Sequence, residues 1–191
     1  MSELFSIQLQ NRQQQGRDGV WLDLPTTTEQ VQAALRQIGI SSDNPQGLFI
    51  SGYFAEEEKR FAIPYNMVLA SNVDELNFLA ARLETLSAGE RAELNAALQA
   101  PQSELSSIGR ITDFPENVDY YVHLPDVHGP AQLGDYYLNR SGMVDMPEEW
   151  KGGIDTAQFG RYVAQQEQGA FTQYGYLVKS GDEWQKVHEG Q

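Results

Sequence analysis

The period of the apolar residues changes along the chain, and this change restricts the fold more than any other feature. Apolar and polar residues alternate over 5–9, which is the period of a half-buried strand, and residues 20–24 and 48–50 are also typical of strands. Between them, residues 26–38 begin with three threonines and place their apolar positions on one helical face. The order strand, strand, helix, strand predicts a small α+β unit.

The middle of the chain has helical spacing throughout. Asn72 and Glu75 have the spacing of an N-cap and N3 residue, and a stripe of leucine and alanine follows them. Ser87 and Glu90 repeat the capping pattern before a second helix, which Pro101 ends. Two helices with so short a connection predict an antiparallel or angled pair.

The last part of the chain mixes both periods. Residues 118–124 alternate as a strand, and Pro130 favours the start of a helix that continues to about residue 139. Residues 155–163 resemble the beginning of another helix, and residues 174–178 and 184–187 predict a terminal hairpin.

The expected fold class is therefore α+β, as an elongated chain of three small domains. We expect an N-terminal α+β domain at 1–63, a helical domain at 64–103, and an acidic α+β domain at 104–191.

Negative charge is concentrated in one stretch of the chain. The sequence has 13 Lys and Arg against 27 Asp and Glu, a net charge of −14, and half of this excess lies in residues 113–155, which hold two basic and nine acidic residues. Tyrosines at 120–121 and 136–137 indicate that this stretch is folded, with core or interface aromatics. A folded acidic surface repels nucleic acids and membranes and attracts basic proteins.

Localisation follows from what the sequence lacks. There is no cysteine, which fits a reducing compartment, and the first ten residues lack the basic and apolar regions of a signal peptide. No apolar run approaches the ~20 residues that span a bilayer. We expect a soluble cytoplasmic protein.

Catalytic and metal-binding patterns are weak. His123 and His128 flank Asp126, but neither a helical pair nor a zinc-finger spacing results, so a structural interpretation is favoured. Glu148 and Glu149 follow Pro147 and suit the first turn of a helix better than a paired acid and base. Phosphate-binding, nucleophile-elbow and zinc-protease motifs are missing from the sequence. We expect no cofactor or metal and no enzymatic activity.

A series of short motifs covers most of the chain. In order they are Gly19-x-Trp21, Leu24-Pro25, Ile38-Gly39, Asp74-Glu75-Leu76-Asn77, Tyr120-Tyr121-Val122, Asp135-Tyr136-Tyr137-Leu138, Gly142, Ile154-Asp155, Phe159-Gly160-Arg161, Gly169-Ala170-Phe171-Thr172 and Gly175-Tyr176. This order resembles antirestriction proteins of the ArdA type. Tyr162 stands where that family usually has an acidic residue, and Thr156 where it commonly has tyrosine.

The resemblance implies a DNA mimic encoded by a mobile genetic element. Such proteins are acidic, elongated homodimers of three-domain chains that imitate bent duplex DNA, and they occupy the DNA-binding groove of type I restriction–modification enzymes. Duplex DNA carries about one negative charge per 1.7 Å of its axis, so fixed carboxylates can meet the same basic groove.

The acidic residues are the expected partner-binding residues, and a smaller group is assigned to the fold or the dimer interface. The partner-binding residues are Asp113, Glu116, Asp119, Asp126, Asp135, Asp145, Glu148, Glu149, Asp155, Glu75, Glu84, Glu90 and Glu93. The fold or dimer-interface residues are Ile154, Phe159, Gly160 and Arg161, and Arg161 is the expected internal ion-pair partner.

Two other functions are compatible with the sequence. One is an acidic adaptor or regulator from a mobile element, which binds a basic protein without imitating DNA. The other is a hydrolase that uses carboxylates, for which no acid–base pair stands out.

Overall fold

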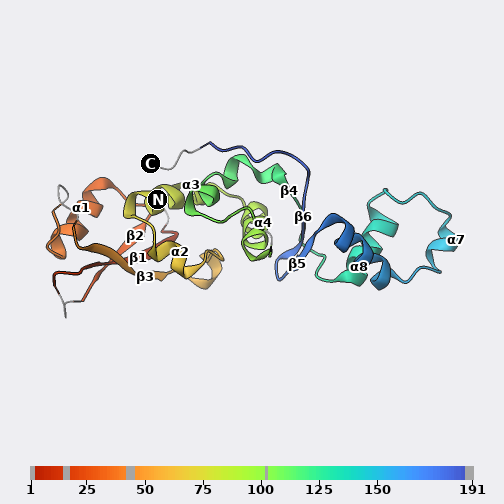
Figure 1. The fold of residues 1–191 in the computed structure, drawn as a ribbon, viewed down its shortest axis with the longest axis horizontal. Coiled ribbons are helices and arrows are strands. Elements are labelled where there is room, and N and C mark those ends of the chain that lie inside the picture. Colours follow the sequence, from red (N-terminus) through yellow and green to blue (C-terminus); the bar gives the residue numbers. More distant parts are fainter. Residues whose placement is uncertain (1–2, 15–17, 42–45, 102, 188–191) are drawn as a thin grey trace. The chain divides into compact units, whose positions relative to one another are not determined.

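The computed structural model describes residues 3–14, 18–41, 46–101 and 103–187, which form two compact units (Figure 1). Unit 1 contains the described parts of residues 1–87, 105–115 and 186–191, and unit 2 contains those of 88–104 and 116–185. Mixed helices and small antiparallel sheets confirm the predicted α+β class. The division into three domains stays a prediction.

The described chain contains both strands and helices, with four successive α-helices in its middle. The strands are β1 (Phe5–Asn11), β2 (Val20–Leu24), β3 (Leu48–Phe54), β4 (Tyr121–Leu124), β5 (Ala170–Thr172) and β6 (Gly175–Lys179). The α-helices are α1 (Thr28–Gln37), α2 (Tyr65–Leu69), α3 (Val73–Glu84), α4 (Ala88–Gln99), α5 (Ile108–Thr112), α6 (Pro130–Asp135), α7 (Glu148–Lys151) and α8 (Thr156–Glu167). The 3₁₀ turns are η1 (Glu57–Lys59), η2 (Phe114–Glu116) and η3 (Val118–Tyr120), and the π-helix η4 (Tyr136–Arg140) continues α6.

Unit 1 is built on an antiparallel sheet with the strand order β2-β1-β3. The strand predicted for 5–9 is confirmed as β1. Phe5, Ile7 and Leu9 are each at most 2% exposed and Gln8 is partly buried, but Ser6 is also buried, so the alternation of burial is incomplete. The predicted helix after Pro25 is α1, and Thr27 caps it through a reciprocal arrangement with Gln30.

Helix α3 supplies much of the remaining core of unit 1. Asn72 accepts a hydrogen bond from the Glu75 N–H at 2.9 Å, as the sequence predicts for an N-cap. The leucine stripe at Leu76, Leu79 and Leu83 is completely buried, and α3 packs against α5. Unit 1 thus takes its helical core from apolar residues at helical spacing.

Unit 2 combines the antiparallel sheet β4-β6-β5 with the helices α6 and α8, which lie side by side (Figure 1). Its core contains Val127, Leu133, Ala164 and Tyr176. The predicted helix from Pro130 to about residue 139 is confirmed as α6 and η4.

Of the strands predicted after residue 117, one is wrong in part and another is wrong throughout. Residues 118–120 form η3, so only the second half of the predicted strand is β4. Residues 184–187 form no strand, because the side chain of Asn117 takes the place of a strand partner. Its Nδ2 donates to the Gln185 carbonyl at 2.9 Å, and its Oδ1 accepts from the Gln185 N–H at 2.7 Å. Strand β6 pairs instead with β4 and β5.

Candidate functional site

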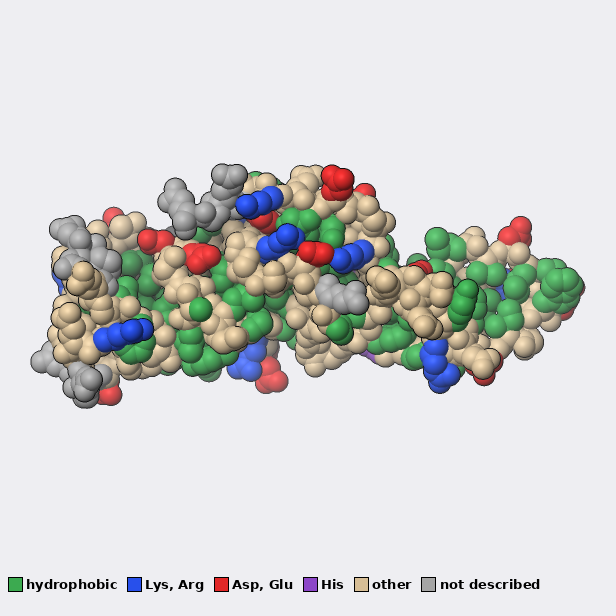
Figure 2. All heavy atoms as spheres, viewed as in Figure 1, with side chains coloured by type: hydrophobic (Ala, Val, Ile, Leu, Met, Phe, Trp, Pro, Cys, Tyr) green, Lys and Arg blue, Asp and Glu red, His purple; other side chains and the backbone are tan. Residues whose placement is uncertain are grey.

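The predicted partner-binding acids differ in their exposure. The exposed ones are Glu116, Asp119, Asp126, Asp145, Glu148, Glu149 and Asp155, and the partly buried ones are Asp135, Glu75, Glu84, Glu90 and Glu93. Asp113 is only 2% exposed and so is not part of the surface. In the view of Figure 2, acidic side chains are scattered over the surface, and some of them lie next to Lys or Arg side chains.

The two basic residues of the acidic segment, which we define as residues 113–155, are both engaged locally. Arg140 contacts Asp135 at 2.7 Å, and Lys151 contacts Glu148 at 2.7 Å. Hydrogen bonds from Arg140 and from a neighbouring asparagine hold the pKa of Asp135 below its ordinary value. Exposed pairs of this kind contribute at most about 1 kcal/mol to stability, but each neutralises one carboxylate locally.

Three exposed carboxylates of the acidic segment have no such counter-charge. Asp126, Asp145 and Glu149 form no ion pair within 4.0 Å in the part of the chain that the structure describes. They can therefore offer full negative charge to a basic partner.

Asp155 also has a structural role, and two neighbouring acids lie where the sequence predicts. The carboxylate of Asp155 accepts a hydrogen bond from the Gln158 N–H at 2.9 Å and caps α8. Glu149 and its neighbour Glu148 lie in the first turn of α7, as the sequence predicts. Asp155 thus serves the fold as well as the surface charge.

Glu93 on α4 is not a full negative charge at neutral pH. Burial raises its pKa to about 8, and Glu90 and Asp119 add to this increase. One of its carboxylate oxygens is buried without a hydrogen-bond partner. A carboxyl group with this pKa is mostly protonated at pH 7, so Glu93 contributes little to an acidic surface.

The assignment of Gly160 to the fold has a clear geometric reason. A Cβ atom built at Gly160 would lie 1.8 Å from the carbonyl oxygen of Pro130, and one built at Gly134 would lie 1.9 Å from that of Thr156. Only glycine allows the backbones of α6 and α8 to approach so closely. Gly160 therefore permits the close packing of α6 against α8.

Arg161 does not form the predicted internal ion pair. Its side chain is exposed and has no carboxylate within 4.0 Å among the residues that the structure describes. The neighbouring Ile154 and Phe159 are partly buried.

A family model for antirestriction protein (ArdA) matches residues 15–178. The chain belongs to the ArdA antirestriction family. The match spans all thirteen acids predicted for partner binding and all four residues assigned to the fold or interface. Membership in the ArdA family implies an antirestriction function. A comparison with individual curated proteins found no match.

Two histidines, His123 and His128, lie in the described part of this ArdA protein. The Nε2 atom of His123 lies 2.7 Å from the Tyr174 carbonyl oxygen, and the backbone N–H of the exposed His128 donates to Gln132. Across the described ranges, His, Asp and Glu side chains do not gather in threes that could hold a metal ion. A search of the same ranges finds no helix that is long and apolar enough to cross a membrane.

The sequence did not predict a hydrogen-bonded cluster that lies in unit 2. The hydroxyl groups of Tyr137 and Tyr176 both donate to the carboxylate of Glu167. Burial first, together with the negative charge of Glu167, raises the pKa of both tyrosines. Only Tyr137 and Tyr176 had a sequence signal, through the family motifs, and nothing in the sequence pairs them with Glu167.

Proposed function

We propose that this ArdA protein inhibits restriction by DNA mimicry. Acting as a homodimer, it occupies the DNA-binding groove of a type I restriction–modification enzyme with the exposed carboxylates of its acidic segment. The observation that carries this proposal is the charge balance of that segment, in which nine acids accompany two basic residues that are both paired locally.

The physical basis is competition for the same basic residues. A groove that binds duplex DNA offers Lys and Arg side chains to a dense row of phosphates. Carboxylates without a counter-charge, such as Asp126, Asp145 and Glu149, can pair with those side chains. Long-range attraction of this kind accelerates association and weakens with added salt.

The test is a cleavage assay with a purified type I enzyme and unmodified DNA at two salt concentrations. The parent protein should inhibit less at the higher salt, and a rising concentration of the cleavable DNA should relieve the inhibition, because the two compete for one groove. An acidic adaptor would bind elsewhere on the enzyme and would not be displaced by DNA. Sedimentation of the parent protein at micromolar concentration should show a dimer, and a monomer at inhibitory concentrations would contradict that part of the proposal.

Charge reversal locates the contact surface. The triple variant Asp126→Lys, Asp145→Lys, Glu149→Lys should weaken inhibition by at least about tenfold, which corresponds to about 0.5 kcal/mol for each lost contact. The matched control is Asp18→Lys, Glu57→Lys, Glu58→Lys, which changes the net charge equally at exposed acids outside the acidic segment. Equal loss in both triples would point to net charge alone, and unchanged inhibition in the first would refute the mechanism.

A further inference from the structure

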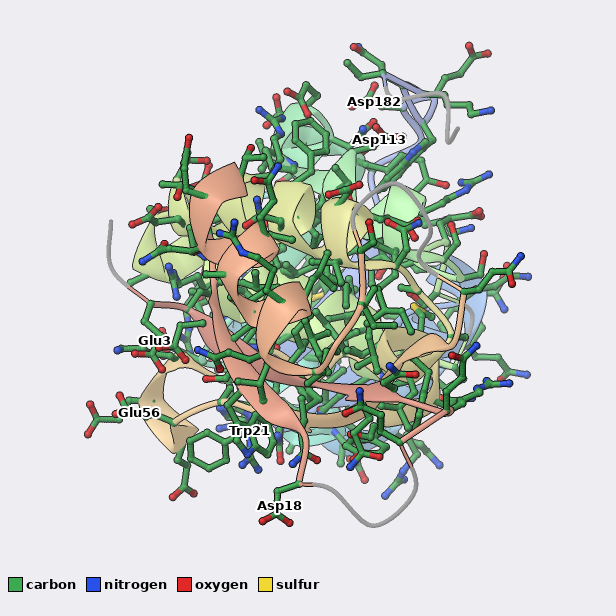
Figure 3. The ribbon with its side chains drawn as sticks, turned by 90° about the vertical axis from the view of Figure 1, so that its left-hand side faces the viewer. Glu3, Asp18, Trp21, Glu56, Asp113 and Asp182 are labelled. Carbon is green, nitrogen blue, oxygen red and sulfur yellow. The ribbon has the colours of Figure 1, made fainter. Side chains whose placement is uncertain are left out.

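The sheet of unit 1 presents an exposed tryptophan on its edge strand β2. Trp21 is 50% exposed, and it lies opposite Gln8 of β1, which in turn lies opposite Gly52 of β3. A Cβ atom at Gly52 would be 3.0 Å from the Cη2 atom of Trp21, so the indole extends across the sheet. Figure 3 labels Trp21 beside the strands of unit 1.

Two carboxylates meet beside this tryptophan. The Ser6 hydroxyl lies 2.8 Å from an oxygen of Asp23 and 3.3 Å from an oxygen of Glu3. A hydroxyl group carries one proton and can donate to only one of them at a time. Neither carboxylate has a Lys, Arg or His partner within 4.0 Å in the described ranges. Two neighbouring negative charges without a counter-ion favour a cation from outside.

These groups line one groove. It has a volume of about 690 Å³, and Glu3, Trp21, Asp23, Thr26 and Gln30 lie along it. Its described lining contains no Lys or Arg. The groove therefore offers an aromatic wall and negative charge to a single long cationic side chain.

Helix α1 also begins at this groove. Its N-terminus carries a partial positive charge that would oppose a cation. That end is capped by the Thr27 side chain, and Glu29 in the first turn adds a negative charge against it. The cap and Glu29 thus reduce the positive potential at this end of the helix.

We infer that this groove is a second contact surface, which binds an arginine side chain of the protein partner. A guanidinium group is planar, donates in a fork that matches a carboxylate, and stacks on an indole ring. Glu3 and Asp23 accept its hydrogen bonds, and Trp21 covers its flat face. The phosphates of nucleic acid are repelled by the same carboxylates. That the arginine belongs to a restriction enzyme rests on the proposed function, but arginine binding itself does not.

The test is a titration of the full-length protein with the tripeptide acetyl-Gly-Arg-Gly-amide, followed by the NMR signals of the indole N–H groups. The three tryptophans, Trp21, Trp150 and Trp184, give separate reporters, and Trp21→Phe assigns the first of them. The Trp21 signal should shift in a saturable manner, and the neutral citrulline tripeptide should produce no saturable shift. Similar shifts at all three indoles would overturn the inference, because they would indicate general attraction to an acidic protein.

Isosteric variants separate the groove from the rest of the surface. Asp23→Asn keeps an oxygen that can accept from Ser6, and Glu3→Gln provides a second variant at the same site. Each should weaken binding of the arginine tripeptide about two- to fivefold, the range expected for one exposed charge pair. The control Glu57→Gln removes an exposed acid of the same unit and should leave binding unchanged. Equal effects of Asp23→Asn and Glu57→Gln would overturn the inference.

The two proposals fail separately. If the parent protein does not inhibit cleavage but binds the arginine tripeptide at Trp21, arginine binding by the groove is supported and the proposed function is refuted. If it inhibits cleavage but shows no saturable shift at Trp21, arginine binding by the groove is refuted and DNA mimicry through the acidic segment is unaffected.

Discussion

The Tyr176 hydroxyl donates a hydrogen bond to the Glu167 carboxylate across 3.0 Å, and Tyr176 is completely buried. Strand β6 is thereby tied to the last residue of α8. The hydroxyl of Tyr137 on η4 donates to the other oxygen of the same carboxylate, so three elements of unit 2 share one polar cluster.

Removal of one hydroxyl from this cluster should weaken unit 2. We expect Tyr176→Phe to lower the free energy of unfolding by about 1–3 kcal/mol, because the carboxylate loses a donor in a mostly buried place. Urea denaturation followed by circular dichroism measures this change. Tyr65→Phe is the control, since Tyr65 is 52% exposed and its hydroxyl lies at the limit of hydrogen-bond distance, 3.5 Å from the Ser51 carbonyl. Equal losses in both variants would contradict a special role for the cluster.

The contact between α6 and α8 should tolerate no side chain at Gly160. Gly160→Ala places a methyl group against the Pro130 carbonyl, and we expect a loss of at least about 3 kcal/mol or failure of unit 2 to fold. Gly89→Ala is the matched control, because Gly89 is also helical but has open space around its Cβ position. It should be neutral or stabilise the protein by up to about 1 kcal/mol. A normally stable Gly160→Ala protein would show that the helices can separate without cost.

Glu93 should make the protein less stable as the pH rises from about 5 to 8. Its folded-state pKa of about 8 lies above the ordinary value of 4.5, so between these values the native state retains a proton that the unfolded state has released. Stability then falls by up to about 1.4 kcal/mol per pH unit from this group. Glu93→Gln should remove that slope and raise stability most at pH 8.

Denaturation of Glu93→Gln and of the parent protein at several pH values measures this effect. Glu57→Gln, at an exposed acid of unit 1, should reproduce the pH dependence of the parent. Parallel curves for Glu93→Gln and the parent would mean that Glu93 is ionised in the native state.

Two substitutions of Asp155 should separate its role as the cap of α8 from its contribution to surface charge. Asp155→Ala removes the hydrogen bond to the Gln158 N–H and should cost about 1 kcal/mol, whereas Asp155→Asn keeps a capping oxygen and should cost less. If DNA mimicry uses this charge, both variants should inhibit restriction more weakly than the parent. A loss of inhibition in the alanine variant alone would assign Asp155 to the fold.

Local patterns predicted much of the fold. The strand at 5–9, the cap at Asn72 and the buried stripe of α3 are all confirmed, because each depends on neighbours within one strand or one helix. The prediction of a terminal strand at 184–187 was wrong. The backbone of Gln185 pairs with the amide side chain of Asn117, which is distant in sequence. Nothing local in the sequence reveals such a partner.

The sequence by itself determined the family, the α+β class and the net charge of −14, since motifs, periodicity and composition are properties of the chain alone. The tertiary structure decided which carboxylates can act as charges. Asp113 is enclosed, Glu93 is held mostly neutral, and Asp135 is paired with Arg140, while Asp126 stays exposed. The physical reason is that hydration and neighbouring charges set the ionisation and reach of a carboxylate, and both depend on packing between segments that are far apart in sequence.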